Sequence, residues 1–248
     1  MAGSKTIKSA FVPGYSPNAI AELAVSLTMA LLRNIVYTVE RTSKQDFIVT
    51  DQLFSREIRG CTVGILGCGR IGRTAAKFIH GLGAKVIGYD LYPVEEAKEY
   101  MEYVSFEEIA KRSDVISIHL NYIKGQNDNL VDAKFVSMMK EHAILIDTGC
   151  GEVVDFEAVL DAVEAGKLDG FGADVVKNET KLFFKDRTGL ELEDKIHQRM
   201  ISLFPKVLIT PHIGSATNLA LRDMIEISLK NMEEILKTGT CKNTLTEK

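Results

Sequence analysis

The 248-residue chain has few cysteines, a small net charge and no long apolar run, and each shortage excludes a class of protein. Its four cysteines (Cys61, Cys68, Cys150 and Cys241) are widely spread and form no C-x-x-C pair, so we expect neither a metal site nor a disulfide framework. Cysteine usage of this kind is typical of a reducing compartment, and we therefore expect a cytoplasmic protein.

Excess positive charge is also missing, since 30 Lys and Arg stand against 34 Asp and Glu and give a formal charge of −4. Binding to a phosphate backbone needs such an excess, so nucleic acid is not an expected partner. The longest apolar stretch near the start, 24–32, contains Ser26 and Thr28 and is far shorter than the roughly 20 residues that cross a bilayer. No membrane contact is expected either.

Short apolar runs alternate with helix-length periodic stretches between about residues 61 and 210. This alternation is typical of an α/β fold with a doubly wound parallel sheet, because strands covered by helices on both faces are apolar on both faces. Ser105 and Asp155 stand where helix N-caps are expected. The expected strands are 62–66, 85–89, 115–120, 143–146, 170–173 and 207–209.

Two long helices, 17–40 and 216–237, are predicted to flank this core. The first is apolar around most of its circumference, which favours a homodimer formed through helix 17–40, with a core helix as the alternative. The second has one apolar stripe and is expected to lie on a surface. The segment 177–205 contains a short helical pattern at 191–204, and connections of this length are often functional. The stripe of the second helix consists of Leu221, Ile225, Leu229, Met232 and Leu236.

The strongest local signal is V-G-I-L-G-C-G-R-I-G at 63–72, a G-x-G-x-x-G between an expected strand and an expected helix. We expect Gly67 to make the tight turn, Gly69 to let a pyrophosphate approach the backbone and Gly72 to let helix and strand pack closely. The next strand ends at Asp90, where a carboxylate would bind the adenosine ribose and repel a 2′-phosphate, so NAD is favoured over NADP. The alternative is a glycine-rich turn that binds no nucleotide.

Four further segments resemble the D-2-hydroxyacid dehydrogenase family, and most closely its D-lactate dehydrogenase branch. They are V-P-G-Y-S-P at 12–17, I-S-I-H-L at 116–120, D-V-V-K-N-E at 174–179 and T-P-H-I-G-S-A-T at 210–217. The resemblance implies a Rossmann-type NAD-binding domain. It also implies hydride transfer between NAD(H) and a 2-hydroxy or 2-oxo acid, a small-molecule substrate.

Through this resemblance, three residues match catalytic positions. His212 matches the general acid and base, a role that suits an imidazole. Glu179 matches the carboxylate that orients this imidazole. Tyr15 matches a tyrosine on the substrate side, with a buried core tyrosine as an equal alternative.

The resemblance also implies a set of contacts with NAD. Asp174 matches the residue that binds the nicotinamide carboxamide, and Arg70 and Ile71 would meet the pyrophosphate through their backbone amides. Asn121 stands where the family usually has proline. The remaining matched positions are Leu91, Leu120, Asn121, Gln126, Thr148, Gly149, Cys150 and His212, together with Gly67, Gly69, Gly72 and Asp90.

One departure from the family lies in the turn L-I-D-T-G-C-G-E at 145–152, where Cys150 replaces the arginine that grips the substrate carboxylate. A thiol cannot make the two charge-assisted hydrogen bonds of a guanidinium, a loss of roughly 2 to 5 kcal/mol, or on the order of tenfold to several thousandfold in rate. Glu152 would also repel an anionic substrate, which leaves a neutral or cationic substrate open. Cys150 is not expected to be a nucleophile, because no base for it is evident.

The second departure is length, because the family places a substrate domain before the V-P-x-Y-S-P segment and only eleven residues precede it here. We expect 1–16 to be a remnant of that domain, 17–211 to be the NAD-binding domain, and 212–248 to be a segment and helix that return toward the missing part. A weakly active or inactive oxidoreductase is therefore expected. The alternative is a non-catalytic, NAD-dependent dimerisation or regulatory module.

Overall fold

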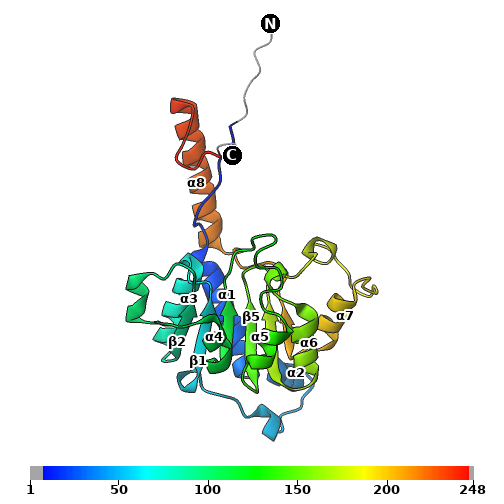
Figure 1. The fold of residues 1–248 in the computed structure, drawn as a ribbon. Coiled ribbons are helices and arrows are strands. Elements are labelled where there is room, and N and C mark those ends of the chain that lie inside the picture. Colours follow the sequence, from blue (N-terminus) through cyan, green and yellow to red (C-terminus); the bar gives the residue numbers. More distant parts are fainter. Residues whose placement is uncertain (1–7, 246–248) are drawn as a thin grey trace.

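Seven parallel strands form the centre of the structure, a computed structural model that describes residues 8–245 (Figure 1). Their order across the sheet is β3-β2-β1-β4-β5-β6-β7, and each neighbouring pair is parallel. This confirms the predicted α/β doubly wound fold. The strands are β1 (Thr62–Leu66), β2 (Lys85–Tyr89), β3 (Glu102–Tyr103), β4 (Val115–Ile118), β5 (Ala143–Asp147), β6 (Leu168–Ala173) and β7 (Val207–Ile209).

Six of these strands are the predicted ones, with small differences at their ends. β4 ends at Ile118, two residues earlier than expected. β3 was not predicted, since its two residues form no apolar run. The strand order reverses between β1 and β4, and open α/β sheets bind ligands at such a switch point, beyond the carboxyl ends of the strands.

Helices cover both faces of the sheet. On one face α1 and α3 bury residues such as Leu27 and Ile79. On the other face α4, α5 and α6 bury Ile109, Phe135 and Val159. The helices are α1 (Pro17–Leu32), α2 (Ile35–Ser43), α3 (Arg70–Gly81), α4 (Phe106–Arg112), α5 (Ala133–Met138), α6 (Phe156–Glu164), α7 (Lys195–Ser202) and α8 (Asn218–Thr238).

Both predicted N-caps are confirmed. The Ser105 hydroxyl accepts a hydrogen bond from the Glu108 amide, and the Glu108 carboxylate accepts one from the Ser105 amide, which completes a capping box. The Asp155 carboxylate accepts a hydrogen bond from the Ala158 amide at 3.3 Å. Each cap fixes the start of a helix that packs on the sheet.

The predicted helix 17–40 is two helices, because Asn34 has a left-handed backbone with φ of 51°. α1 packs against α3, β5 and β6, and its side chains fill space above the strand glycines, as Leu31 does at Gly170. The core-helix alternative is thus confirmed for 17–32. Within 8–245 no single helix is long and apolar enough to cross a bilayer, and α1 and α2 reach that length only as a pair bent by 64°.

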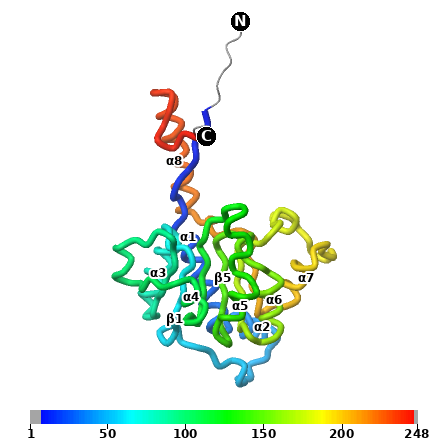
Figure 2. Tube along the Cα trace, in the orientation of Figure 1, coloured from blue at the N-terminus to red at the C-terminus, as the bar shows by residue number. Residues whose placement is uncertain are grey.

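The apolar stripe of α8 is exposed, so the described residues do not provide the surface on which this helix was predicted to lie. Leu221, Leu229 and Leu236 are 52%, 59% and 84% exposed. In Figures 1 and 2 α8 extends away from the sheet, with residues 8–16 beside it, and Asn231 donates a hydrogen bond to the Phe11 carbonyl at 3.0 Å. In this position α8 buries only a narrow strip of its surface, which includes Ala220 and Asn231.

The long connection after β6 contains α7, which is shorter than the predicted 191–204. It begins after Asp194, whose carboxylate accepts hydrogen bonds from the amides of Ile196 and His197. Phe183 is buried and anchors the middle of the connection against the core. The connection therefore holds the residues around 179 at the carboxyl edge of the sheet.

Candidate functional site

The turn between β1 and α3 has the geometry that a dinucleotide pyrophosphate requires. Gly67 has φ of +89°, and a Cβ there would lie 2.8 Å from the His119 carbonyl. A Cβ at Gly72 would collide with the Gly67 oxygen, so α3 packs onto β1 only through a glycine. A Cβ at Gly69 would meet no described residue within 4 Å, which leaves room for a phosphate to approach. The residues present therefore fit the pyrophosphate of NAD.

Arg70 and Ile71 occupy the first two positions of α3, where backbone amides have no acceptor within the helix. These amides and the positive end of the helix dipole favour a bound anion. The Arg70 guanidinium lies against Gly14, so the segment that carries Tyr15 is next to this turn. Tyr15 is half-buried.

Asp90 follows β2 and joins its end to the glycine-rich turn. Its Oδ2 accepts a hydrogen bond from the Cys68 amide at 2.6 Å, and its Oδ1 accepts one from the Tyr92 amide at 2.8 Å. Each carboxylate oxygen can accept a second hydrogen bond, so the predicted contact with the ribose remains available. Leu91, beside it, is 74% exposed.

His119, which follows β4, is a buried histidine to which the sequence analysis assigned no role. His119 Nε2 is 2.9 Å from the Ser117 hydroxyl, and its Nδ1 is 3.3 Å from the Thr148 hydroxyl. Burial lowers the pKa of His119 to about 4, so the ring is neutral near pH 7. The signal available in the sequence was the pair Ser117 and His119, whose spacing of two directs both side chains to one face of a strand.

The loops after β4 and β5 meet beside His119. Leu120 is half-buried, whereas Asn121 and Gln126 are exposed on the loop that follows. A Cβ at Gly149 would lie 3.0 Å from the Leu120 oxygen, so the two loops pack without a side chain between them. These positions lie on the part of the carboxyl edge where contacts with the adenosine are predicted.

Asp174 holds the segment that contains His212. It is 2% exposed, its Oδ1 accepts hydrogen bonds from the Thr210 hydroxyl at 2.6 Å and the Ile213 amide at 2.8 Å, and its Oδ2 accepts one from the Gly214 amide at 2.8 Å. One acceptor position on Oδ2 is left. The predicted bond to the nicotinamide carboxamide therefore has a single place to form.

His212 and Glu179 are brought together at the carboxyl edge of the sheet. His212 Nδ1 lies 2.9 Å from Glu179 Oε1, and the two side chains are 46% and 28% exposed. His212 has φ of 55°, a conformation that costs free energy in a residue other than glycine. Its amide donates to the Asp174 and Thr210 carbonyls, which holds that backbone in place. The imidazole can thus exchange a proton through Nε2 while Glu179 fixes the other nitrogen.

The turn after β5 is neutral or acidic where the resemblance places an arginine. The Cys150 thiol donates a hydrogen bond to Glu152 Oε2 at 2.9 Å. Burial, followed by that bond to Glu152, raises the pKa of Cys150 to about 11, so the thiol is protonated near pH 7. This is the opposite of what a nucleophilic cysteine needs. Tyr122, whose hydroxyl donates to Asp128 at 2.5 Å, lies near the same turn.

Asp147, at the end of β5, is a second residue that sequence reasoning did not assign. It is fully buried, one oxygen accepts the Gly149 amide at 2.9 Å, and Oδ2 has no hydrogen-bond partner in the described part of the chain. Burial raises its pKa to about 7, with Glu152 and Asp174 adding repulsion. In the sequence, the signal for this residue was an aspartate at the end of an otherwise apolar strand.

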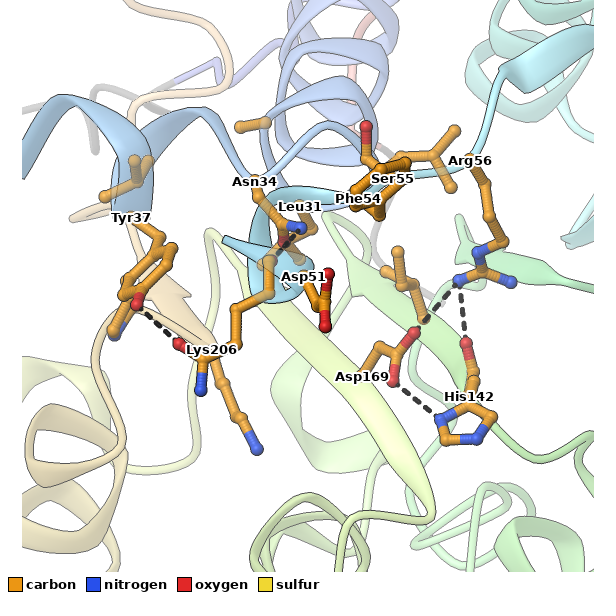
Figure 3. Close-up of a pocket in the computed structure, with 16 residues that line it drawn as sticks. Leu31, Asn34, Tyr37, Asp51, Phe54, Ser55, Arg56, His142, Asp169 and Lys206 are labelled. Atoms are coloured by element: carbon orange, nitrogen blue, oxygen red, sulfur yellow. Dashed lines mark hydrogen bonds and ion pairs between the residues drawn. The ribbon is translucent and has the colours of Figure 1, made fainter. Parts of the chain in front are cut away.

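A cavity of about 800 Å³ lies at the opposite, amino edge of the sheet (Figure 3). Arg56 donates a hydrogen bond to the His142 carbonyl at 2.7 Å, and His142 Nδ1 lies 3.0 Å from Asp169. None of the predicted cofactor or catalytic residues lines it. Within 8–245 no three His, Cys, Asp or Glu residues gather closely enough to hold a metal ion.

Comparison with known proteins shows which family the chain resembles. Residues 25–214 match the NAD-binding domain of D-isomer specific 2-hydroxyacid dehydrogenases. An aromatic 2-oxoacid reductase of Clostridium sporogenes is 35% identical over 96% of this chain and 71% of its own length. The D-lactate dehydrogenase of Lactiplantibacillus plantarum is 38% identical over 92% of this chain and 68% of its own length.

Solved structures agree with these relatives. A D-lactate dehydrogenase from Sporolactobacillus has a TM-score of 0.92 at 41% identity, over 97% of this chain and 71% of that one. The NAD-complexed D-isomer specific 2-hydroxyacid dehydrogenase of Lactobacillus delbrueckii has a TM-score of 0.88 at 33% identity, over 97% of this chain and 72% of that one. The sequence resemblance is therefore confirmed, the cofactor is NAD, and the chain belongs to the D-isomer specific 2-hydroxyacid dehydrogenase family.

Proposed function

We propose that this chain transfers hydride between NAD(H) and a small 2-oxo or 2-hydroxy compound, with His212 as the acid and base. The observation that carries this proposal is the 2.9 Å contact between His212 Nδ1 and Glu179 Oε1, at the same carboxyl edge of the sheet as the glycine-rich turn. The bound nicotinamide supplies or accepts the hydride. His212 gives a proton to the carbonyl oxygen as the hydride arrives at the neighbouring carbon, and it accepts that proton in the reverse direction.

The chain's own residues divide the remaining work. The α3 amides hold the pyrophosphate, Asp90 binds the ribose, and Asp174 binds the carboxamide while it keeps the His212 segment in place. Glu179 stabilises the protonated imidazole and fixes its orientation. Tyr15 borders the substrate side of this edge.

We also propose that turnover of 2-oxo acids is slow. The turn after β5 presents Cys150 and Glu152, which offer a carboxylate no bidentate cation. The test is NADH oxidation with pyruvate by the unmodified chain and by Cys150→Arg. We expect a low kcat/KM that rises in the arginine variant, and fast pyruvate turnover by the unmodified chain would contradict this part.

A homodimer is proposed on a different surface from the one first expected. The apolar side chains of α1 are buried or half-buried in the core of this chain and leave no exposed face for a partner. In contrast, α2 exposes Ile35 and Val39. In the segment after α2 the side chains of Phe47, Val49 and Phe54 are 73%, 78% and 79% exposed. Phe54 also borders the cavity at the amino edge, which is large enough to receive side chains of a second copy (Figure 3). The four free cysteines suit a cytoplasmic protein.

Light scattering tests this dimer and its alternative role together. A concentration-dependent dimer is expected, and the double variant Phe47→Ser, Phe54→Ser should be monomeric, with Phe184→Ser, another exposed phenylalanine, as the matched control. The non-catalytic, NAD-dependent module remains the second candidate, because this exposed apolar segment and the cofactor turn occur in one chain. A change of association state with NADH, without NADH oxidation, would favour that module over the enzyme.

A further inference from the structure

The turn 148–152 and the short helix η4 (Gly151–Val153) lie where the substituent beside the reacting carbonyl must be recognised. The turn follows β5, which neighbours β6 in the sheet, and β6 leads directly to Asp174 and so to the His212 segment. The Asp174 amide donates a hydrogen bond to the Asp147 carbonyl at 2.9 Å, which places the turn and the His212 support at one edge. A substrate whose carbonyl faces His212 therefore presents its neighbouring groups to this edge.

The chemistry of the turn is that of a hydrogen-bond acceptor. The Cys150 hydrogen is directed to Glu152 Oε2, so the thiol has no second hydrogen to offer a substrate oxygen. Glu152 is half-buried, and its Oε2 accepts the Cys150 thiol hydrogen. The charged groups that act on Cys150 are Glu152 and Asp147, and both repel a negative charge.

Glu152, rather than the neighbouring Asp147, is the acceptor at this turn that a ligand can reach. Asp147, which precedes the turn, is 0% exposed, and its Oδ2 has no partner among residues 8–245, so this carboxyl is out of reach of a ligand. A bound carboxylate would bring a second negative charge close to Glu152. A group that donates hydrogen bonds would instead bond to the Glu152 carboxylate.

We propose that Cys150 and Glu152 make this site select 2-oxo amides over 2-oxo acids. The proposal rests on the hydride transfer proposed above and names its substrate class. The amide N–H₂ donates to Glu152, where a carboxylate oxygen would be repelled. In the reduction the carbonyl carbon receives the hydride of NADH and its oxygen receives the proton of His212, which yields the 2-hydroxy amide and NAD⁺.

A matched pair of unreactive ligands tests this selection by binding alone. Oxamate carries a carboxylate and oxamide carries an amide at the same position, and both are titrated by calorimetry into the full chain saturated with NADH. We expect oxamide to bind at least about tenfold more tightly than oxamate, the size of effect that a desolvated charge mismatch produces. Pyruvamide should likewise be reduced faster than pyruvate.

Glu152→Gln should shrink the ratio of oxamide to oxamate affinity, because it removes the repulsive charge and keeps the shape. Glu141→Gln is the control, since Glu141 is an exposed carboxylate before the opposite end of β5. Tighter binding of oxamate than oxamide, an unchanged ratio in Glu152→Gln, or binding of neither ligand to the NADH complex would each overturn the proposal. Failure of NADH itself to bind would be a separate result that overturns the proposed function.

Discussion

His212 Nδ1 lies 2.9 Å from Glu179 Oε1, although the two residues are 33 positions apart in the chain. Glu179 begins the short helix η5 (Glu179–Lys181), and His212 follows β7. The contact fixes which imidazole nitrogen faces the crevice, and the hydrogen bonds from His212 and Ile213 to Asp174 hold the backbone that carries the ring. Proton transfer at Nε2 is the chemistry that this arrangement supports best.

Glu179→Gln should slow hydride transfer while NADH binding is kept. The amide can still orient the ring, but it no longer stabilises the protonated imidazole, so we expect a loss in kcat on the order of ten- to a thousandfold. Glu179→Asp should recover part of the rate because it restores the charge. Steady-state rates with a 2-oxo substrate and NADH fluorescence titration measure the two effects, and equal rates in all three proteins would remove Glu179 from the mechanism.

The two later glycines of the motif should fail in different ways when each is replaced by alanine. A Cβ at Gly72 would collide with the Gly67 oxygen, so Gly72→Ala should lower both stability and NADH affinity. A Cβ at Gly69 would meet no described atom within 4 Å, so Gly69→Ala should keep the unfolding midpoint and weaken NADH binding alone. Thermal unfolding without cofactor, followed by NADH titration, separates them. Full NADH affinity in Gly69→Ala would show that the pyrophosphate does not approach this turn.

Asp147 should make the protein less stable as pH rises. Burial raises its pKa to about 7 in the folded chain, above the usual value near 3.9. The stability that the protonated carboxyl contributes is therefore fully present below about pH 4 and is lost as pH rises through about 7. Asp147→Asn should be more stable than the parent by about 1 to 4 kcal/mol at about pH 8, and the gain should shrink toward about pH 4.

Urea unfolding across this pH range measures that difference. Asp223→Asn, which changes an exposed carboxylate on α8, is the control and should show a small difference that does not depend on pH. A constant difference between Asp147→Asn and the parent at all pH values would mean that Asp147 is ionised throughout.

His119 should act in the opposite direction over a similar range. Burial lowers its pKa to about 4, below the usual value near 6.5. The stability that the neutral ring contributes is therefore fully present above about pH 6.5 and is lost as pH falls toward about 4. His119→Gln, whose amide can still bond Ser117 and Thr148, should lose less stability over that window in urea unfolding. A parallel loss in parent and variant would contradict the buried, neutral ring.

The strands and the cofactor turn could be predicted from the sequence because their signals are local. Six apolar runs of parallel-sheet type correspond to six strands, and the spacing of Gly67, Gly69 and Gly72 fixes a turn whose tight contacts the structure contains. Local signals also fixed the caps at Ser105 and Asp155. In each case the information lies within a few residues.

What the sequence did not reveal depends on tertiary contacts. The break at Asn34 interrupts an unbroken helical pattern, and the apolar stripe of α8 does not say what covers it. The use of Asp174 as a support for the His212 segment, and the orphaned oxygen of Asp147, follow only from which loops meet at the carboxyl edge. Burial of polar groups is decided by packing rather than by local pattern.

The most direct test of the central claim, hydride transfer through His212, is a single-turnover experiment in which excess protein and NADH meet a 2-oxo substrate. We expect the unmodified chain to oxidise NADH in one phase, and we expect His212→Asn to bind NADH equally well but to lose that phase by on the order of a hundredfold or more. Equal single-turnover rates in the two proteins, with NADH bound to both, would contradict the account.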